Sequence, residues 1–184
     1  ELRPKNAKVY QFPTHVAECG GDGRIERVPG ESAYRCVAKD SDALHRRRLY
    51  YFTSKGAMNI DGVGPRIIDT LLEHNLINTY ADFYTLTEGD LRGLPHFKEK
   101  SAQNVIAAIN ATRTIPLERL LTALSIEHVG EETARIIAES CGTIEAVQNA
   151  DEATLAKIHG VGNVVAHSFV AWMRDKAHIK QLNE

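Results

Sequence analysis

Apolar residues recur at the spacing of one helix face from residue 57 to the end of the chain. Pro65 opens one such stretch, where proline is tolerated because the first N–H of a helix has no partner within the helix. The apolar positions that follow it are Ile67, Ile68, Leu71 and Leu72. The same period predicts helices over residues 98–110, 131–140 and 163–173, with Gly142 ending the helix over 131–140. We expect no strand in this region.

Residues 1–56 follow a different pattern, with short alternating stretches in place of helical stripes. The alternation predicts strands over residues 7–12, 24–28 and 33–37, the last two joined by the turn-rich stretch 29–32. Ser41 is a typical N-cap and predicts a helix over residues 42–53. The sequence thus predicts a small β unit, too small for a core of its own, followed by a basic helix.

A five-residue pattern recurs four times between the predicted helices of the second region. Its complete copies are Ile60-Asp61-Gly62-Val63-Gly64 and Ile158-His159-Gly160-Val161-Gly162. Its weaker copies are Leu94-Pro95-His96-Phe97-Lys98 and Ile126-Glu127-His128-Val129-Gly130. The copies start at residues 60, 94, 126 and 158, so the repeating unit is a helix, a tight turn and a second helix.

The turn has a physical use beyond reversing the chain. Glycine permits positive φ, so the chain can turn within a few residues, and the valine between the glycines is expected to point inward. The first N–H groups of the following helix then face outward, where the helix dipole favours an anionic oxygen. Main-chain donors of this kind hold a nucleic-acid backbone without reading its bases. The alternative interpretation is a plain connection between helices, which is most plausible for the copy at 94–98.

Composition and charge narrow the possible functions. The 184 residues are 43% hydrophobic and 25% charged, which argues against wholesale disorder, and no apolar run is long enough to span a membrane. The net charge of −2 divides into +4 for residues 1–56 and −6 for residues 57–184, so the helical region cannot attract DNA by bulk charge. Three cysteines cannot form a complete disulfide framework, which favours a reducing compartment and a cytoplasmic location.

The order of the motifs resembles that of bacterial NAD-dependent DNA ligases, and the repeated turns resemble helix-hairpin-helix motifs. The resemblance runs along almost the whole chain, through Arg3-Pro4-Lys5-Asn6, Phe12-Pro13-Thr14-His15, Cys19-Gly20-Gly21, Tyr34-Arg35-Cys36, residues 52–60, residues 123–134 and the last turn. It implies a mainly α fold, with a tandem helix-hairpin-helix domain after a small β hairpin like a zinc ribbon. The implied domains are a linker over 1–13 from an oligonucleotide-binding barrel, a degenerate zinc-finger-like subdomain over 14–56, and four motifs over 57–184.

The resemblance also says what this chain lacks. The family places its catalytic lysine in a Lys-x-Asp-Gly motif of an adenylation domain, and no such motif occurs here. We therefore expect the fragment alone to be inactive and to bind no cofactor, with NAD and Mg serving the parent protein. The implied partners are nicked double-stranded DNA and the remaining ligase domains, with no membrane.

The zinc finger of the family is incomplete in this sequence. Its four cysteines fall here on Val16, Cys19, Cys36 and Ser41, so only Cys19 and Cys36 could act as metal ligands. Two thiolates do not close a tetrahedral site, although His15, His45 or Asp42 could in principle complete one. The alternative is a hairpin that persists without zinc.

The leading hypothesis is a module that holds duplex DNA by its phosphates, as the DNA-clamping part of a ligase that seals nicks in replication and repair. The candidate DNA-binding residues are Gly62, Gly64, Arg66, Lys98, Lys100, Gly130, Thr133, Gly160, Gly162, Arg46 and Arg47. One rival is a protein–protein interaction scaffold, which the acidic balance of residues 57–184 favours. Another is a structure-selective nuclease, although no carboxylate cluster with metal-site spacing stands out.

Overall fold

The computed structural model describes residues 10–30, 32–38, 41–95 and 97–183. The chain divides into two compact units, residues 1–47 and 48–184. The division falls inside the first long helix, earlier than the 56/57 boundary expected from the sequence. The physical reason is that Leu49 and Phe52, in the second half of that helix, are buried in the core of the second unit.

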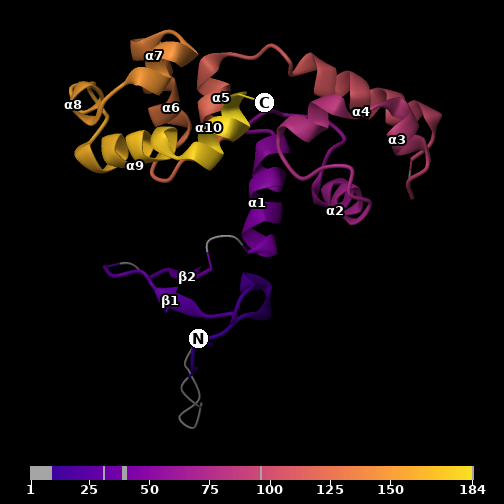
Figure 1. Ribbon diagram of the computed structural model, residues 1–184, viewed down its shortest axis with the longest axis horizontal. Coiled ribbons are helices and arrows are strands. Elements are labelled where there is room, and N and C mark those ends of the chain that lie inside the picture. Colours follow the sequence, from indigo (N-terminus) through magenta and orange to yellow (C-terminus); the bar gives the residue numbers. More distant parts are fainter. Residues whose placement is uncertain (1–9, 31, 39–40, 96, 184) are drawn as a thin grey trace, which may run out of the picture. The chain divides into compact units, whose positions relative to one another are not determined.

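The order of elements matches the expected change from strands to helices (Figure 1). The first unit contains the 3-10 turn η1 (Ala17–Cys19), the strands β1 (Ile25–Arg27) and β2 (Tyr34–Cys36), and the start of α1 (Asp42–Thr53). The second contains α2 (Pro65–Glu73), η2 (Ala81–Thr85), α3 (Glu88–Arg92), α4 (Glu99–Ala111), α5 (Leu117–Ala123), α6 (Glu131–Cys141), α7 (Ile144–Asn149), α8 (Glu152–Leu155), α9 (Asn163–Arg174) and α10 (Lys176–Asn183).

The first unit is organised by one antiparallel hairpin. Strands β1 and β2 pair so that Ile25 lies opposite Cys36 and Arg27 lies opposite Tyr34. The predicted turn between them is present, with Gly30 at a φ of 81°. The predicted strand over 7–12 lies outside the described residues up to residue 9, and residues 10–12 form no strand. Phe12 instead stacks on Tyr34, with ring centroids 3.9 Å apart.

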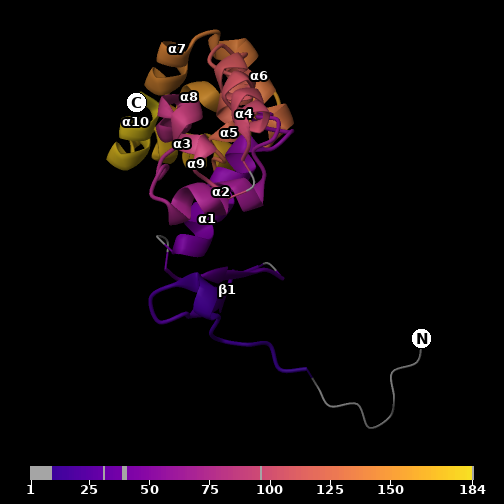
Figure 2. The ribbon, with the colours of Figure 1, turned by 90° about the vertical axis from the view of Figure 1, so that its right-hand side faces the viewer.

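The second unit contains two hydrophobic cores, and each core belongs to two of the repeated turns. The first core extends from Leu49 to Ile109 and the second from Leu121 to Met173, while Ala123 of α5 is buried in the first core. In Figure 1, α2 to α4 lie on one side of α5 and α6 to α9 lie on the other. Figure 2 looks along this row, with α2, α3 and α4 in front. The unit is therefore a tandem of two similar halves.

The apolar periodicity predicted the long helices of this unit to within one or two residues. The expected ranges 98–110, 131–140 and 163–173 correspond to α4, α6 and α9, and Gly142 ends α6 at a φ of 77°. Ser41 caps α1, since its Oγ accepts from the amide of Leu44 at 3.3 Å. The apolar period gave no separate prediction for α5, α7 or α10. Within the described ranges, no helix combines the length and the apolar character needed to cross a membrane.

Candidate nucleic-acid interface

The four repeated turns fold in the same way. In each turn, the amide of the fourth residue donates to the carbonyl of the first, from Val63 to Ile60, Phe97 to Leu94, Val129 to Ile126 and Val161 to Ile158, at 3.0 to 3.3 Å. The donor residue is buried in all four turns. This inward apolar residue fixes each corner against its core, as the sequence pattern predicts. We refer to these corners as hairpins 1 to 4 in chain order.

The third residue adopts the left-handed conformation in the three hairpins where it is described. Gly62 has a φ of 78° and Gly160 a φ of 89°, and His128 takes the same place in hairpin 3 with a φ of 64°. The corresponding His96 of hairpin 2 lies outside the described residues. A Cβ added at Gly62 would lie 3.2 Å from Val105 Cγ2, and one at Gly160 would lie 3.1 Å from Ile136 Cδ1. Both conformation and packing thus favour glycine at 62 and 160.

Replacing Gly62 or Gly160 with Ala should therefore lower the free energy of unfolding by about 1–2 kcal/mol. The reverse change, His128→Gly, should raise it by roughly 0.5 kcal/mol because it relieves a side chain held at positive φ. Urea denaturation followed by helical circular dichroism measures both effects. The neighbouring Gly64→Ser is the control, since its backbone is extended and nothing lies within 4 Å of the added Cβ. Equal losses at 62 and 64 would contradict this account.

The fifth residue of a hairpin is glycine for a different reason. Gly64, Gly130 and Gly162 are the N-caps of α2, α6 and α9, with φ between −77° and −97°, which any residue adopts. All three are exposed, and nothing lies within 4 Å of a Cβ built on them. Neither backbone strain nor packing explains glycine at these positions. Their common property is that the start of each helix is open to an approaching group.

Other helices of the same unit are capped by their own side chains. Thr87, Thr143 and Asp151 accept hydrogen bonds from the amides of the first turns of α3, α7 and α8. The three glycine-capped helices have no side-chain cap among the described residues, and neither do α4 and α5, which follow Lys98 and Pro116. All four hairpin helices thus begin without a side-chain cap at the positive end of the helix dipole, and three of them begin at glycine. In α2 the first helical residue is Pro65, which has no N–H, so that helix has one donor fewer.

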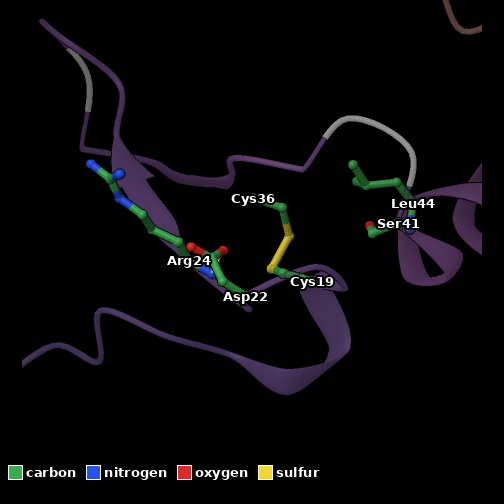
Figure 3. Close-up of a disulfide and its surroundings, with 6 residues drawn as sticks. All are labelled: Cys19, Asp22, Arg24, Cys36, Ser41 and Leu44. Atoms are coloured by element: carbon green, nitrogen blue, oxygen red, sulfur yellow. Dashed lines mark hydrogen bonds between the residues drawn. A yellow bond between two sulfur atoms is a disulfide. The ribbon is translucent and has the colours of Figure 1, made fainter.

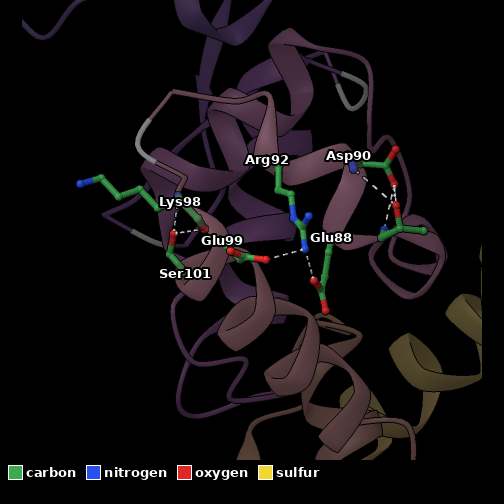
Figure 4. A network of polar contacts seen from close by, with 7 residues as sticks. Glu88, Asp90, Arg92, Lys98, Glu99 and Ser101 are labelled. Atoms are coloured by element: carbon green, nitrogen blue, oxygen red, sulfur yellow. Dashed lines mark hydrogen bonds and ion pairs between the residues drawn. The ribbon is translucent and has the colours of Figure 1, made fainter.

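Hairpin 2 differs from the other three (Figure 4). Its N-cap is Lys98, whose amide donates to Ser101 Oγ at 2.8 Å. Arg92 bonds Glu88 at 2.9 Å and Glu99 at 3.3 Å, which ties α3 to the first turn of α4. The Lys98 side chain extends away from this network. Hairpin 2 therefore differs in that the amide of its N-cap residue bonds to a hydroxyl of the chain and that an exposed ammonium group stands where the other hairpins have glycine.

Hairpin 3 carries acidic side chains close to its amides. Glu131 and Glu132 lie in the first turn of α6. Arg135 bonds both Glu132 and Glu139, and its hydrogen bonds and charge lower the pKa of the Glu132 carboxyl. Glu132 is therefore ionised at neutral pH and paired with a cation, which reduces its repulsion of an anion at Gly130.

The remaining predicted residues are distributed over both units. In the second unit, Arg66 and Lys100 are exposed near the starts of α2 and α4, and Thr133 is half-buried in the first turn of α6. In the first unit, Arg46 is half-buried and Arg47 exposed on α1. The structure thus brings Arg66, Lys100 and Thr133 next to hairpins 1, 2 and 3, whereas the two arginines of α1 belong to the other unit.

The cysteines predicted as incomplete metal ligands are joined to each other instead (Figure 3). The sulfurs of Cys19 and Cys36 form a disulfide that links η1 to β2, and Cys19 is buried. A disulfide sulfur is not the thiolate that zinc requires, so the metal assignment at these two residues is corrected. Zinc does not fit the described residues, which contain no group of three His, Cys, Asp or Glu side chains able to hold a metal ion. The pairing also departs from the expectation drawn from the odd cysteine count.

The regions that contain these hairpins match two known protein-family models. Residues 55–111 match the family model described as "SAM-like Helix-hairpin-helix tandem", and residues 119–182 match the "Helix-hairpin-helix motif" model. The two matches coincide with the two halves of the helical unit.

Curated relatives match along the whole chain. A DNA ligase of Latilactobacillus sakei is 42% identical over 94% of this chain, one of Anoxybacillus flavithermus 40% identical over 100%, and one of Oenococcus oeni 37% identical over 99%. The chain spans about a quarter of the length of these relatives, 25%, 27% and 26% respectively. The chain therefore belongs to the helix-hairpin-helix proteins and corresponds to a segment of the DNA ligase family.

Proposed function

We propose that the helical unit binds duplex DNA by its phosphate backbone, without sequence preference. The observation that carries this proposal is the set of open glycine N-caps at Gly64, Gly130 and Gly162. At each of them a missing side chain leaves room for a phosphate oxygen to approach the first-turn amides of a helix, of which α2 has one fewer because Pro65 has no N–H. The same helix starts supply the positive end of a dipole, which favours the anion.

Main-chain contacts would also explain how a region of acidic composition can bind DNA. Residues 57–184 carry a formal charge of −6, so attraction by side-chain charge alone is insufficient. An amide donor needs only local access to a phosphate, and it is indifferent to the base that the phosphate joins. Arg66, Lys98 and Lys100 would add side-chain contacts beside hairpins 1 and 2.

The proposed context is a longer protein, an NAD-dependent DNA ligase that seals nicks, in which this segment helps to hold the nicked duplex. The resemblance to ligases over the whole chain supports this assignment. NAD and Mg would act in other parts of that protein, since its lysyl-adenylate motif has no counterpart in this sequence. Its other domains are the proposed protein partners.

A salt titration tests DNA binding directly. Anisotropy of a labelled duplex should show an affinity that falls about 40-fold between about 50 and 200 mM salt, as expected if Arg66, Lys98 and Lys100 neutralise roughly three phosphates. Two duplexes of unrelated sequence should bind equally, and nicked and intact forms should both bind. Absence of binding, or an affinity that salt leaves unchanged, would reject the proposal in favour of a protein–protein scaffold.

A further inference from the structure

Helix α5 connects the two halves of the helical unit. Its residue Ala123 is buried in the first core, while Leu121 belongs to the second. A pocket of about 320 Å³ lies at this junction, lined from the first half by Phe52, Met58 and Tyr80 and from the second by Leu120, Leu124 and Leu182, among others. Apolar packing alone therefore leaves the contact between the halves partly open.

An arginine of α5 joins the halves by polar contacts at the same junction. Arg119 of α5 donates from Nε to the carbonyl of Ala57 at 3.0 Å and from Nη2 to the carbonyl of Lys55 at 3.0 Å. Both acceptors belong to the turn between α1 and hairpin 1. That turn is itself rigid, since the amides of Ala57 and Asn59 both donate to the Ser54 carbonyl and the Ala57 side chain is fully buried.

Both ends of this contact lead directly to a hairpin. The turn that Arg119 contacts continues into Ile60, the first residue of hairpin 1. Helix α5 ends at Ala123, shortly before Ile126, the first residue of hairpin 3. The guanidinium group presents its donors in a fixed plane, so two bonds to one turn define an orientation as well as a distance.

We propose that Arg119 is a positioning residue, which fixes hairpin 1 relative to hairpin 3 so that both halves of the unit contact one duplex. The proposal rests on the DNA binding proposed above. Two sites held at the correct spacing bind a common polymer more tightly than two loosely linked sites, because less orientational freedom is lost on binding. The gain exists only for a duplex long enough to reach both halves.

The test compares Arg119→Ala and Arg119→Lys on duplexes of about 10 and about 20 base pairs, one and two helical turns. Both variants should bind the longer duplex about tenfold more weakly and the shorter one within about twofold of the unchanged protein. Arg119→Lys keeps the charge but loses the two-donor fork. Arg113→Ala is the matched control, because Arg113 bonds Tyr84 and Asn110 within the first half only.

Spin labels test the positioning without DNA. Labels are placed at Gln103 in α4 and Ala171 in α9, two exposed positions in different halves, in a Cys141→Ser background. The distance distribution should broaden in Arg119→Ala and stay narrow in Arg113→Ala. An unchanged distance distribution in Arg119→Ala would overturn the role of Arg119. So would full affinity of Arg119→Lys for the longer duplex, or an equal loss of affinity for both duplexes. Absence of binding by the unchanged protein would reject the proposed function instead, while the distances still decide the positioning.

Discussion

Replacing Gly162 with Asp should leave the protein folded, and slightly more stable, while lowering its affinity for duplex DNA at least tenfold. An aspartate at an N-cap accepts from the first amides of the helix and is at least as favourable there as glycine, by a few tenths of a kcal/mol. The open space at Gly162 accommodates the side chain. The carboxylate would occupy the amides offered to a phosphate and repel it as well. The triple change at Gly64, Gly130 and Gly162 should abolish measurable binding.

A substitution that raises the free energy of unfolding but lowers the affinity for DNA indicates that the residue belongs to a binding surface and not to a plain turn. Urea denaturation gives the free energy of unfolding, and anisotropy with a labelled duplex gives the affinity. Thr143→Asp is the matched control, because it adds the same charge at the N-cap of α7, which follows no hairpin. If Gly162→Asp and Thr143→Asp weaken DNA binding equally, the effect is one of net charge, and the open N-caps have no specific role.

Reducing the Cys19–Cys36 disulfide should destabilise the β hairpin of the first unit by about 3 kcal/mol, since the bond closes a loop with a sequence separation of 17. The consequence is local. The amides of Val28 and Val37, which donate across the hairpin to the carbonyls of Ala33 and Arg24, should exchange roughly 100-fold faster after reduction. Ile68 in the second unit, whose side chain is fully buried, should keep its exchange rate.

Hydrogen exchange of the oxidised and reduced protein, followed by mass spectrometry, measures this effect. Cys141→Ser is the control, because Cys141 is the free cysteine among the described residues and lies on α6. Alkylation of Cys19 and Cys36 before any reductant is added would contradict the disulfide. One equivalent of zinc bound to these two residues in the purified protein would contradict it too.

The repeat was the most informative part of the sequence. The sequence pattern of residues 60–64 recurs at residues 158–162, which predicts the same turn geometry at both places. The structure confirms the same backbone hydrogen bond in all four copies. The sequence did not separate the two kinds of glycine. A side chain at Gly62 would crowd Val105 of α4 and one at Gly160 would crowd Ile136 of α6, helices that are distant along the chain, whereas Gly64 and Gly162 face open space.

The sequence alone determined the secondary structure of this protein. Its signals are the apolar period, Pro65, Ser41 and the glycine turns, and each of them affects only residues a few positions away. Long-range contacts were decided only by the tertiary structure. Arg119 meets carbonyls more than sixty residues away, and Cys19 meets Cys36 because the hairpin places them together. The boundary within α1 likewise depends on which core buries Leu49. No local pattern encodes such partners, because each depends on how separate elements pack.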